Sequence, residues 1–89
     1  MRTDELKLDG NAIGGLLYEL FGRELTAASS TCRSCGAVEL LACVDVYVHA
    51  PGTVVRCRHC EAVLMKVVQG PGRSWLDLSG FGSIELPES

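Results

Sequence analysis

The chain has 89 residues, of which 47% are hydrophobic and 21% charged, and its formal net charge is -3. This length suits one domain spanning residues 1–89, and the hydrophobic content argues against disorder. The negative charge disfavours non-specific binding of DNA or RNA across the whole surface. The charged start M-R-T-D-E-L-K-L-D does not read as a secretory signal, and no run approaches the ~18 apolar residues of a membrane span. We therefore expect a cytoplasmic protein with no membrane partner, in a reducing compartment.

Residues 9–22 predict a short amphipathic helix. Asp9 can cap its start and Gly22 can end it. Gly14 and Gly15 weaken this helix by roughly 1 kcal/mol each relative to alanine. Two explanations fit these glycines: a close approach of the helix backbone to a sheet, or a frayed first turn. The apolar residues follow helical spacing, at Ile13, Leu16, Leu17, Leu20 and Phe21.

Residues 24–86 read as strands and turns that carry the cysteine motifs. Residues 38–49 alternate between two faces, which predicts one long strand with Cys43 in its middle. Residues 62–68 are almost continuously apolar, as in a strand covered on both sides. The fold class is therefore small, β-rich α+β, an antiparallel sheet preceded by one short helix. Further strands are expected at 53–56, 74–78 and 83–86, and turns at 50–52 and 69–72.

Two Cys-x2-Cys motifs, Cys32 with Cys35 and Cys57 with Cys60, are separated by 21 residues. This is the spacing of a tetrathiolate zinc site, because each motif can wrap a tight turn around one side of the metal. All four positions are cysteine, so the site would be closed and structural, with no coordination position left for a substrate. With zinc bound, the net charge becomes about -5.

Alternatives to this metal site stay open. Iron is the second metal, because rubredoxin-type sites use the same two motifs, and colour would separate it from zinc. Gly36 follows the first motif, where a positive φ relaxes the turn, whereas Glu61 takes that place after the second motif and predicts a less regular turn. His59 is expected to be a solvated residue of its turn. Cys43 is expected to pack in the sheet, with a reactive thiol as the alternative.

No catalytic constellation is visible. No nucleophile has an adjacent base, and the turn at 50–52 holds no acid pair. The glycine-containing turns at 70–72 and 80–82 do not lead into a helix, as a phosphate-binding loop does. We therefore expect a chain that is not an enzyme.

Arginine and aromatic residues suggest a binding surface. The arginines around the cysteine motifs either offset the thiolate charge or form a patch for phosphate or acidic groups. The indole of Trp75 has charged neighbours two residues away on both sides, so its face either contacts a partner or covers the edge of a small core. A sheet edge could also pair with an identical subunit or a partner strand. The candidate surface residues are Arg33, Arg56, Arg58, Tyr47, Arg73 and Trp75.

The chain resembles a family of small, uncharacterised actinobacterial zinc-ribbon proteins, a domain of unknown function. The resemblance is carried by L-K-L-D-G-N-A at residues 6–12, the following G-L-L-Y-E-L-F-G, and T-C-R-S-C-G-A around the first cysteine motif. It continues in D-V-Y at 45–47, V-L-M at 63–65 and R-S-W-L-D-L at 73–78. The resemblance implies a zinc-ribbon fold, a bacterial cytoplasmic setting, and metal ligation by Cys32, Cys35, Cys57 and Cys60. It implies no catalytic residue.

Two functions are then in competition. The first is a metal-stabilised adaptor whose partner is a protein, with the ribosome or another nucleic-acid assembly as the alternative. The second is a zinc- or redox-responsive switch, since a structural zinc contributes roughly 10–16 kcal/mol of apparent binding free energy and its loss should unfold a small domain.

Overall fold

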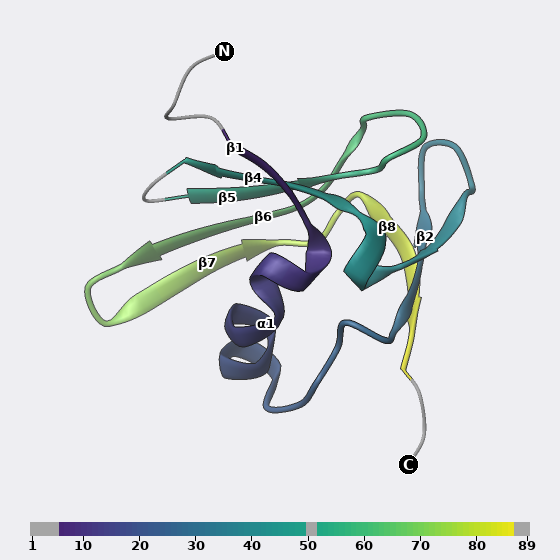
Figure 1. Cartoon of the computed structure of the whole chain (residues 1–89). Helices are drawn as coiled ribbons and strands as arrows, with labels where there is room; N and C mark the ends of the chain where they lie inside the picture. Colours follow the sequence, from purple (N-terminus) through teal and green to yellow (C-terminus); the bar gives the residue numbers. More distant parts are fainter. Residues whose placement is uncertain (1–5, 50–51, 87–89) are drawn as a thin grey trace.

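The computed structural model describes residues 6–49 and 52–86. The expectation of a small, β-rich chain with antiparallel sheets and one short helix near the N-terminus is confirmed (Figure 1). The larger sheet has the order β1-β4-β5-β6-β7 and the smaller sheet the order β3-β2-β8. The larger sheet comprises β1 (Leu6–Asp9), β4 (Asp45–His49), β5 (Gly52–Arg56), β6 (Val63–Gly70) and β7 (Arg73–Asp77). The smaller comprises β2 (Ser29–Cys32), β3 (Val38–Leu40) and β8 (Phe81–Glu85).

The predicted helix is shorter than expected. Its first residues form the end of β1 and a 3-10 turn, η1 (Gly10–Ile13), and the α-helix α1 spans Gly14–Phe21. Asp9 caps η1 by accepting a hydrogen bond from the backbone N–H of Asn11 at 3.0 Å. Gly22 ends α1 in the left-handed region, at φ +74°, and its N–H donates to the carbonyl of Tyr18. The expected stop residue is therefore confirmed, whereas Asp9 caps η1 and α1 begins after Ile13 without a side-chain cap.

A close backbone approach does occur, but at Gly10 rather than at Gly14 or Gly15. A Cβ atom on Gly10 would lie 1.5 Å from the carbonyl oxygen of Leu41, whereas Gly15 has no atom within 4 Å of such a position. A Cβ on Gly14 would make only an ordinary contact, at 3.4 Å from a side-chain methyl group. Gly10 is therefore required by the packing of η1 against the turn at Leu41.

The single strand expected at 38–49 is wrong. A second 3-10 turn, η2 (Leu41–Cys43), divides this segment into β3 of the smaller sheet and β4 of the larger one. The N–H of Leu41 donates to the carbonyl of Ala28 at 2.9 Å, and the N–H of Ala42 donates to that of Thr26 at 3.0 Å. Leu41 and Val44 are both buried three residues apart, a spacing that would place them on opposite faces of a continuous strand. Contacts with a distant loop thus override the local alternation, and Cys43 lies on a turn.

The strand β6 is covered on both sides only at its start. Leu64 and Met65 are both buried, but further along Val67 is buried while Lys66 and Val68 are exposed. The expected two-sided burial over the whole of 62–68 is therefore wrong. Beyond Met65 the strand follows the alternation of a sheet with one face in solvent.

The turn predicted at 69–72 is confirmed, because β6 and β7 form a hairpin closed by Pro71 and Gly72, with Gly72 at φ +72°. The ring of Trp75 lies against Gly70, where a Cβ would be 3.1 Å from the indole. The first two residues of the turn expected at 50–52 lie outside the described residues, and β4 and β5 pair up to His49 and Gly52.

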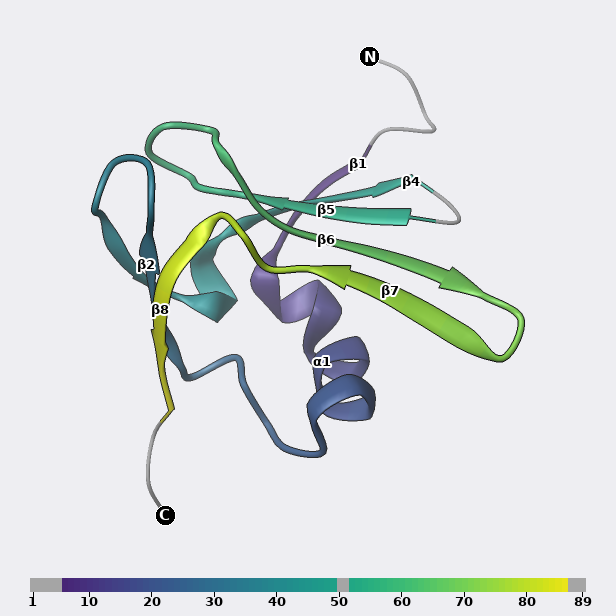
Figure 2. The same ribbon diagram turned by 180° about the vertical axis from the view of Figure 1, so that it is seen from behind.

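The core lies between α1, the inner face of the larger sheet and the smaller sheet (Figure 2). The turn η1 contributes Ile13 and α1 contributes Leu17. Leu16 and Leu20 are partly buried beside them, while Phe21 is 40% exposed. Figure 2 shows β8 leaving the end of β7 and crossing to pair with β2. The sheets contribute Val46, Val55, Met65, Val67, Cys32 and Phe81 to the buried set.

We predict opposite effects for alanine at two glycines of the N-terminal segment. Gly10→Ala should lower the free energy of unfolding by roughly 2–4 kcal/mol, because its Cβ meets backbone that cannot move without breaking the η1–η2 contact. Gly15→Ala should raise it by up to about 1 kcal/mol, since the site is open and alanine favours the helix. Urea unfolding of both metal-loaded variants measures this, and equal effects would contradict the packing described.

Candidate metal centre

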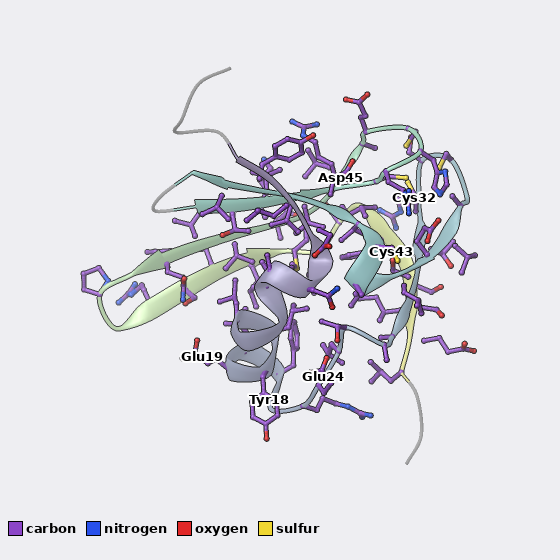
Figure 3. The ribbon with its side chains drawn as sticks, in the orientation of Figure 1. Tyr18, Glu19, Glu24, Cys32, Cys43 and Asp45 are labelled. Atoms are coloured by element: carbon purple, nitrogen blue, oxygen red, sulfur yellow. The ribbon has the colours of Figure 1, made fainter. Side chains whose placement is uncertain are left out.

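Four cysteine side chains converge where the two sheets meet. Cys32 ends β2, Cys57 follows β5, and the two tight loops after them bring Cys35 and Cys60 to the same point. In Figure 3, sulfur atoms gather around Cys32 at the tips of these loops, apart from Cys43. All four sulfur atoms lie within 4.8 Å of one another.

The spacing of the sulfur atoms suits a tetrahedral ion. The Sγ atoms of Cys32 and Cys60 are 3.7 Å apart, and so are those of Cys35 and Cys57. Ligands of a tetrahedral zinc site lie about 3.8 Å apart when each zinc–sulfur bond is about 2.3 Å. The four cysteines are therefore arranged as a closed site that could hold one metal ion.

The two loops are built by the same backbone hydrogen bonds. In the first loop, the N–H of Gly36 donates to the carbonyl of Cys32, and the N–H of Cys32 donates to that of Ala37, both at 2.9 Å. In the second loop, the N–H groups of Glu61 and Cys57 make the equivalent bonds, to Cys57 and Ala62, also at 2.9 Å. Each loop presents both sulfur atoms on one side of its turn.

Glu61 does not make the second loop less regular, contrary to the expectation. It takes the left-handed conformation, at φ +64°, that Gly36 takes at φ +78° in the first loop. Glu61 is the only non-glycine residue at positive φ among those described. This conformation costs roughly 1–2 kcal/mol for a residue with a Cβ. The hydrogen-bond pattern of the loop is kept in spite of that cost.

The similarity of the two cysteine loops is visible in the sequence as a repeat that extends beyond the two cysteines of each motif. C-R-S-C-G-A-V begins at Cys32 and C-R-H-C-E-A-V begins at Cys57, so the repeat is C-R-x-C-x-A-V. The alanine of each copy accepts the bond that closes its loop, and the valine begins β3 or β6. The repeated unit is therefore a loop together with the start of its outgoing strand.

A third segment, between β7 and β8, joins the first loop to the start of β6. The carbonyl of Gly80 accepts from the N–H of Arg33 at 2.9 Å, and the N–H of Gly80 donates to the carbonyl of Leu64 at 3.2 Å. A Cβ on Gly80 would lie 1.9 Å from the carbonyl oxygen of Val63. Only glycine fits against this part of β6, and the sequence pattern showed no more than a turn at this position.

A side-chain contact also joins the two loops. The Nε2 atom of His59 lies 2.8 Å from a carboxylate oxygen of Glu39, which is on β3 after the first loop. His59 is exposed as expected, but this nitrogen is paired with Glu39 rather than only with solvent. His59 therefore contributes a cross-loop contact at the edge of the cluster.

The thiols differ in burial and in acidity. Cys32 and Cys57 are buried, whereas Cys35 and Cys60 are exposed. The backbone N–H of Cys35 is the main cause that lowers the pKa of the Cys32 thiol to about 7. The N–H of Ala37 lowers the pKa of Cys35, but burial and the three neighbouring thiols outweigh it and raise that pKa to about 12. One sulfur thus ionises readily while another holds its proton, as expected of thiols that lie close enough to affect one another's ionisation.

The arginines near the cluster make structural contacts. The guanidinium of Arg33 donates to the carbonyl of Ser79 at 3.3 Å, and that of Arg56 donates to the carbonyl of Glu61 at 2.9 Å. Arg58 is exposed beside Cys57. Two of the three arginines therefore help to hold the loops, in addition to offsetting thiolate charge.

The other candidate surface residues share the outer face of the larger sheet, opposite α1. Tyr47 pairs with Val54, Val54 with Lys66, and Lys66 with Asp77, so these residues form one row across the sheet. Arg73, Trp75 and Asp77 occupy every second position of the edge strand β7, so all three lie on this face. Trp75 is 55% exposed. Tyr47 and Trp75 are separated by β5 and β6, so they belong to one face but do not form a single contact site.

Binding of a divalent, thiol-seeking ion at this centre should strengthen as the pH rises. With its pKa near 12, Cys35 keeps its proton between pH 6 and 9, so the ion must displace that proton over this whole range. Affinity should therefore rise at least about tenfold per pH unit, and more steeply below pH 7, where Cys32 is also protonated. Competition with a chromogenic chelator between pH 6 and 8.5 measures the slope, and a pH-independent affinity would contradict the thiol assignment.

Comparisons with known proteins place the chain in a family. No helix of the described segments is long and apolar enough to cross a membrane. No curated protein and no solved structure shows significant similarity to the chain. A family profile, however, matches residues 2–89, which is nearly the full length. The chain belongs to the family of unknown function DUF6510.

Proposed function

We propose that the four cysteines bind one structural Zn²⁺ and that the chain is a zinc-ribbon-like, non-catalytic binding or adaptor module. The observation that carries the proposal is the 3.7 Å separation of the sulfur pairs Cys32–Cys60 and Cys35–Cys57 at the junction of both sheets. A zinc ion bound here would neutralise thiolate repulsion and link the two loops covalently through the metal. Iron is the alternative occupant of the same four sulfurs.

The donor set supports a structural role. Four thiolates complete a tetrahedral coordination shell, so no position remains where a substrate or an activated water could bind. Ligands come from two loops that belong to different sheets, and each loop is closed by its own backbone bonds. The ion would therefore fix the relative position of the sheets instead of supplying chemistry.

A protein partner fits the remaining surface better than nucleic acid. The guanidinium groups of Arg33 and Arg56 already donate to backbone carbonyls, which supports a structural role for two of the three arginines near the cluster. On the outer sheet face, the basic side chain of Lys66 lies opposite acidic Asp77, and the aromatic rings of Tyr47 and Trp75 are on the same face. Mixed charge with aromatic residues is typical of protein interfaces, whereas nucleic-acid surfaces carry a basic excess.

A zinc- or redox-responsive switch is the second candidate function. The observation that favours it is the exposure of Cys35 and Cys60, one ligand from each loop. An oxidant that reaches these two sulfurs would release the ion, and with it the roughly 10–16 kcal/mol of apparent binding free energy that a structural zinc supplies.

We predict that Cys35→Ser abolishes metal binding and leaves the chain largely unfolded, because three thiolates do not retain the ion firmly enough to hold both loops. Cys43→Ser is the matched control. Cys43 lies on η2 outside the sulfur cluster, so this variant should keep about one zinc per chain and the wild-type circular dichroism spectrum. Elemental analysis and thermal melting measure both variants. Metal-free native protein, or a Cys35→Ser variant with wild-type melting, would contradict the proposed site. A red protein that contains iron would show that the bound metal is iron and not zinc.

The adaptor proposal predicts a discrete partner that depends on the outer sheet face. Affinity purification with the zinc form, followed by mass spectrometry, should recover that partner, and Tyr47→Ser with Arg73→Ser should reduce its yield at least fivefold. Val38→Ser, at an exposed site on β3, is the control and should leave the yield unchanged. Recovery of RNA that falls steeply with salt would instead favour a nucleic-acid partner. Absence of any partner, with zinc release by sub-millimolar peroxide, would favour the switch.

A further inference from the structure

A cavity of about 290 Å³ lies where α1 and the smaller sheet meet the end of the larger sheet. Figures 1 and 2 show α1 and β8 on the same side of β6, and all three elements contribute residues to the cavity lining. Its floor consists of buried apolar side chains from five separate segments: Leu17, Leu25, Leu41, Met65 and Phe81. These are core residues, so the floor is as rigid as the core itself.

The rim of the cavity is apolar and exposed. Phe21 is 40% exposed, Leu78 is 37% exposed and Leu86 is 41% exposed. All three line the cavity together with the floor residues. Exposed apolar side chains around a concave apolar site are the surface that a ligand would cover.

The size of this surface favours a small molecule over a protein partner. Three side chains that are about two-fifths exposed offer on the order of 200 Å² of apolar surface. Each partner of a stable protein–protein interface buries roughly 800 Å². An apolar cavity of about 150 Å³ holds one benzene molecule, so this cavity has room for a ligand of roughly twelve carbon atoms.

The positive charge of Arg23 indicates that such a ligand carries a negatively charged head group. It is the one charged residue among the described residues that line the cavity, and it is exposed. Arg23 also makes an interaction within the chain. A guanidinium has five N–H donors, so it can hold a carboxylate in addition to an existing partner. The remaining lining is apolar and offers no partner to a polar group in the body of the ligand.

We propose that this cavity binds a straight-chain monocarboxylate of about ten carbon atoms, with the alkyl chain on the apolar floor and the carboxylate at Arg23. The site is separate from the four cysteines, and the inference does not depend on the identity of the metal or on the adaptor function. It gives the chain a second ligand of a different chemical class.

Calorimetric titration of the metal-loaded full chain with sodium decanoate, below its micelle concentration, tests the proposal. Saturable binding with one site per chain is expected, and affinity should rise about three- to fourfold per methylene from hexanoate to decanoate and then level off at longer chains. Absence of saturable binding, or affinity that keeps rising up to hexadecanoate, would overturn it.

Three tryptophan variants locate the site. Leu78→Trp and Leu86→Trp place a larger ring at the exposed rim, where it fills the cavity without removing a core side chain, and each should weaken decanoate binding at least tenfold. Val38→Trp puts the same ring on β3, at a position that is 62% exposed and does not line the cavity, and should bind decanoate like the wild type. Metal content and circular dichroism of each variant confirm folding. Equal behaviour of the rim and control variants overturns the assignment, as does a wild-type dimer that the rim variants dissociate.

A comparison of decanoate with decanol distinguishes the contribution of the head group to binding from that of the alkyl chain. Arg23→Gln should weaken decanoate binding at least fivefold and leave decanol binding unchanged, because only the carboxylate interacts with the guanidinium. Equal losses for decanoate and decanol would show that Arg23 acts only through packing and would overturn the assignment of a carboxylate ligand.

Discussion

The rest of the structure is arranged around four cysteine sulfur atoms that lie within 4.8 Å of one another where the two sheets meet. Thiolates this close together would repel one another unless a positive ion lay among them, and the neighbouring thiols help to raise the pKa of Cys35 to about 12. The smaller sheet has strands of only three to five residues, too short to persist in isolation. The smaller sheet meets the larger one at the sulfur cluster and at Gly80. These contacts with the larger sheet stabilise it.

The sequence predicts those features of the fold that depend on residues close together in the chain. The cysteine spacing, the cap at Asp9, the stop at Gly22 and the Pro71–Gly72 hairpin all follow from short-range rules, and the structure contains each of them. The break at residues 41–43 could not be predicted, because carbonyl groups of a loop some fifteen residues away cause it. The requirement for glycine at positions 10 and 80 is equally non-local, since both contact backbone that the sequence pattern does not place nearby.

The molecule separates its two candidate ligand sites from its candidate partner surface. The sulfur cluster lies at the tips of the two cysteine loops, and the apolar cavity lies where α1 meets the sheets. The outer face of the larger sheet carries the aromatic and charged side chains, and no helix of the described residues covers it (Figure 1). A partner could therefore bind this face while the metal and an apolar ligand stay in place, since no residue is shared between the three surfaces.

The position of Gly80 makes the link between the sheets depend on the later part of the chain. Both cysteine loops lie within residues 32–62, and their own backbone hydrogen bonds close them without Gly80. The bonds of Gly80 to Arg33 and Leu64 join the first loop to the start of β6. A chain shortened before residue 80 would therefore keep all four cysteines but lose this link between the two sheets.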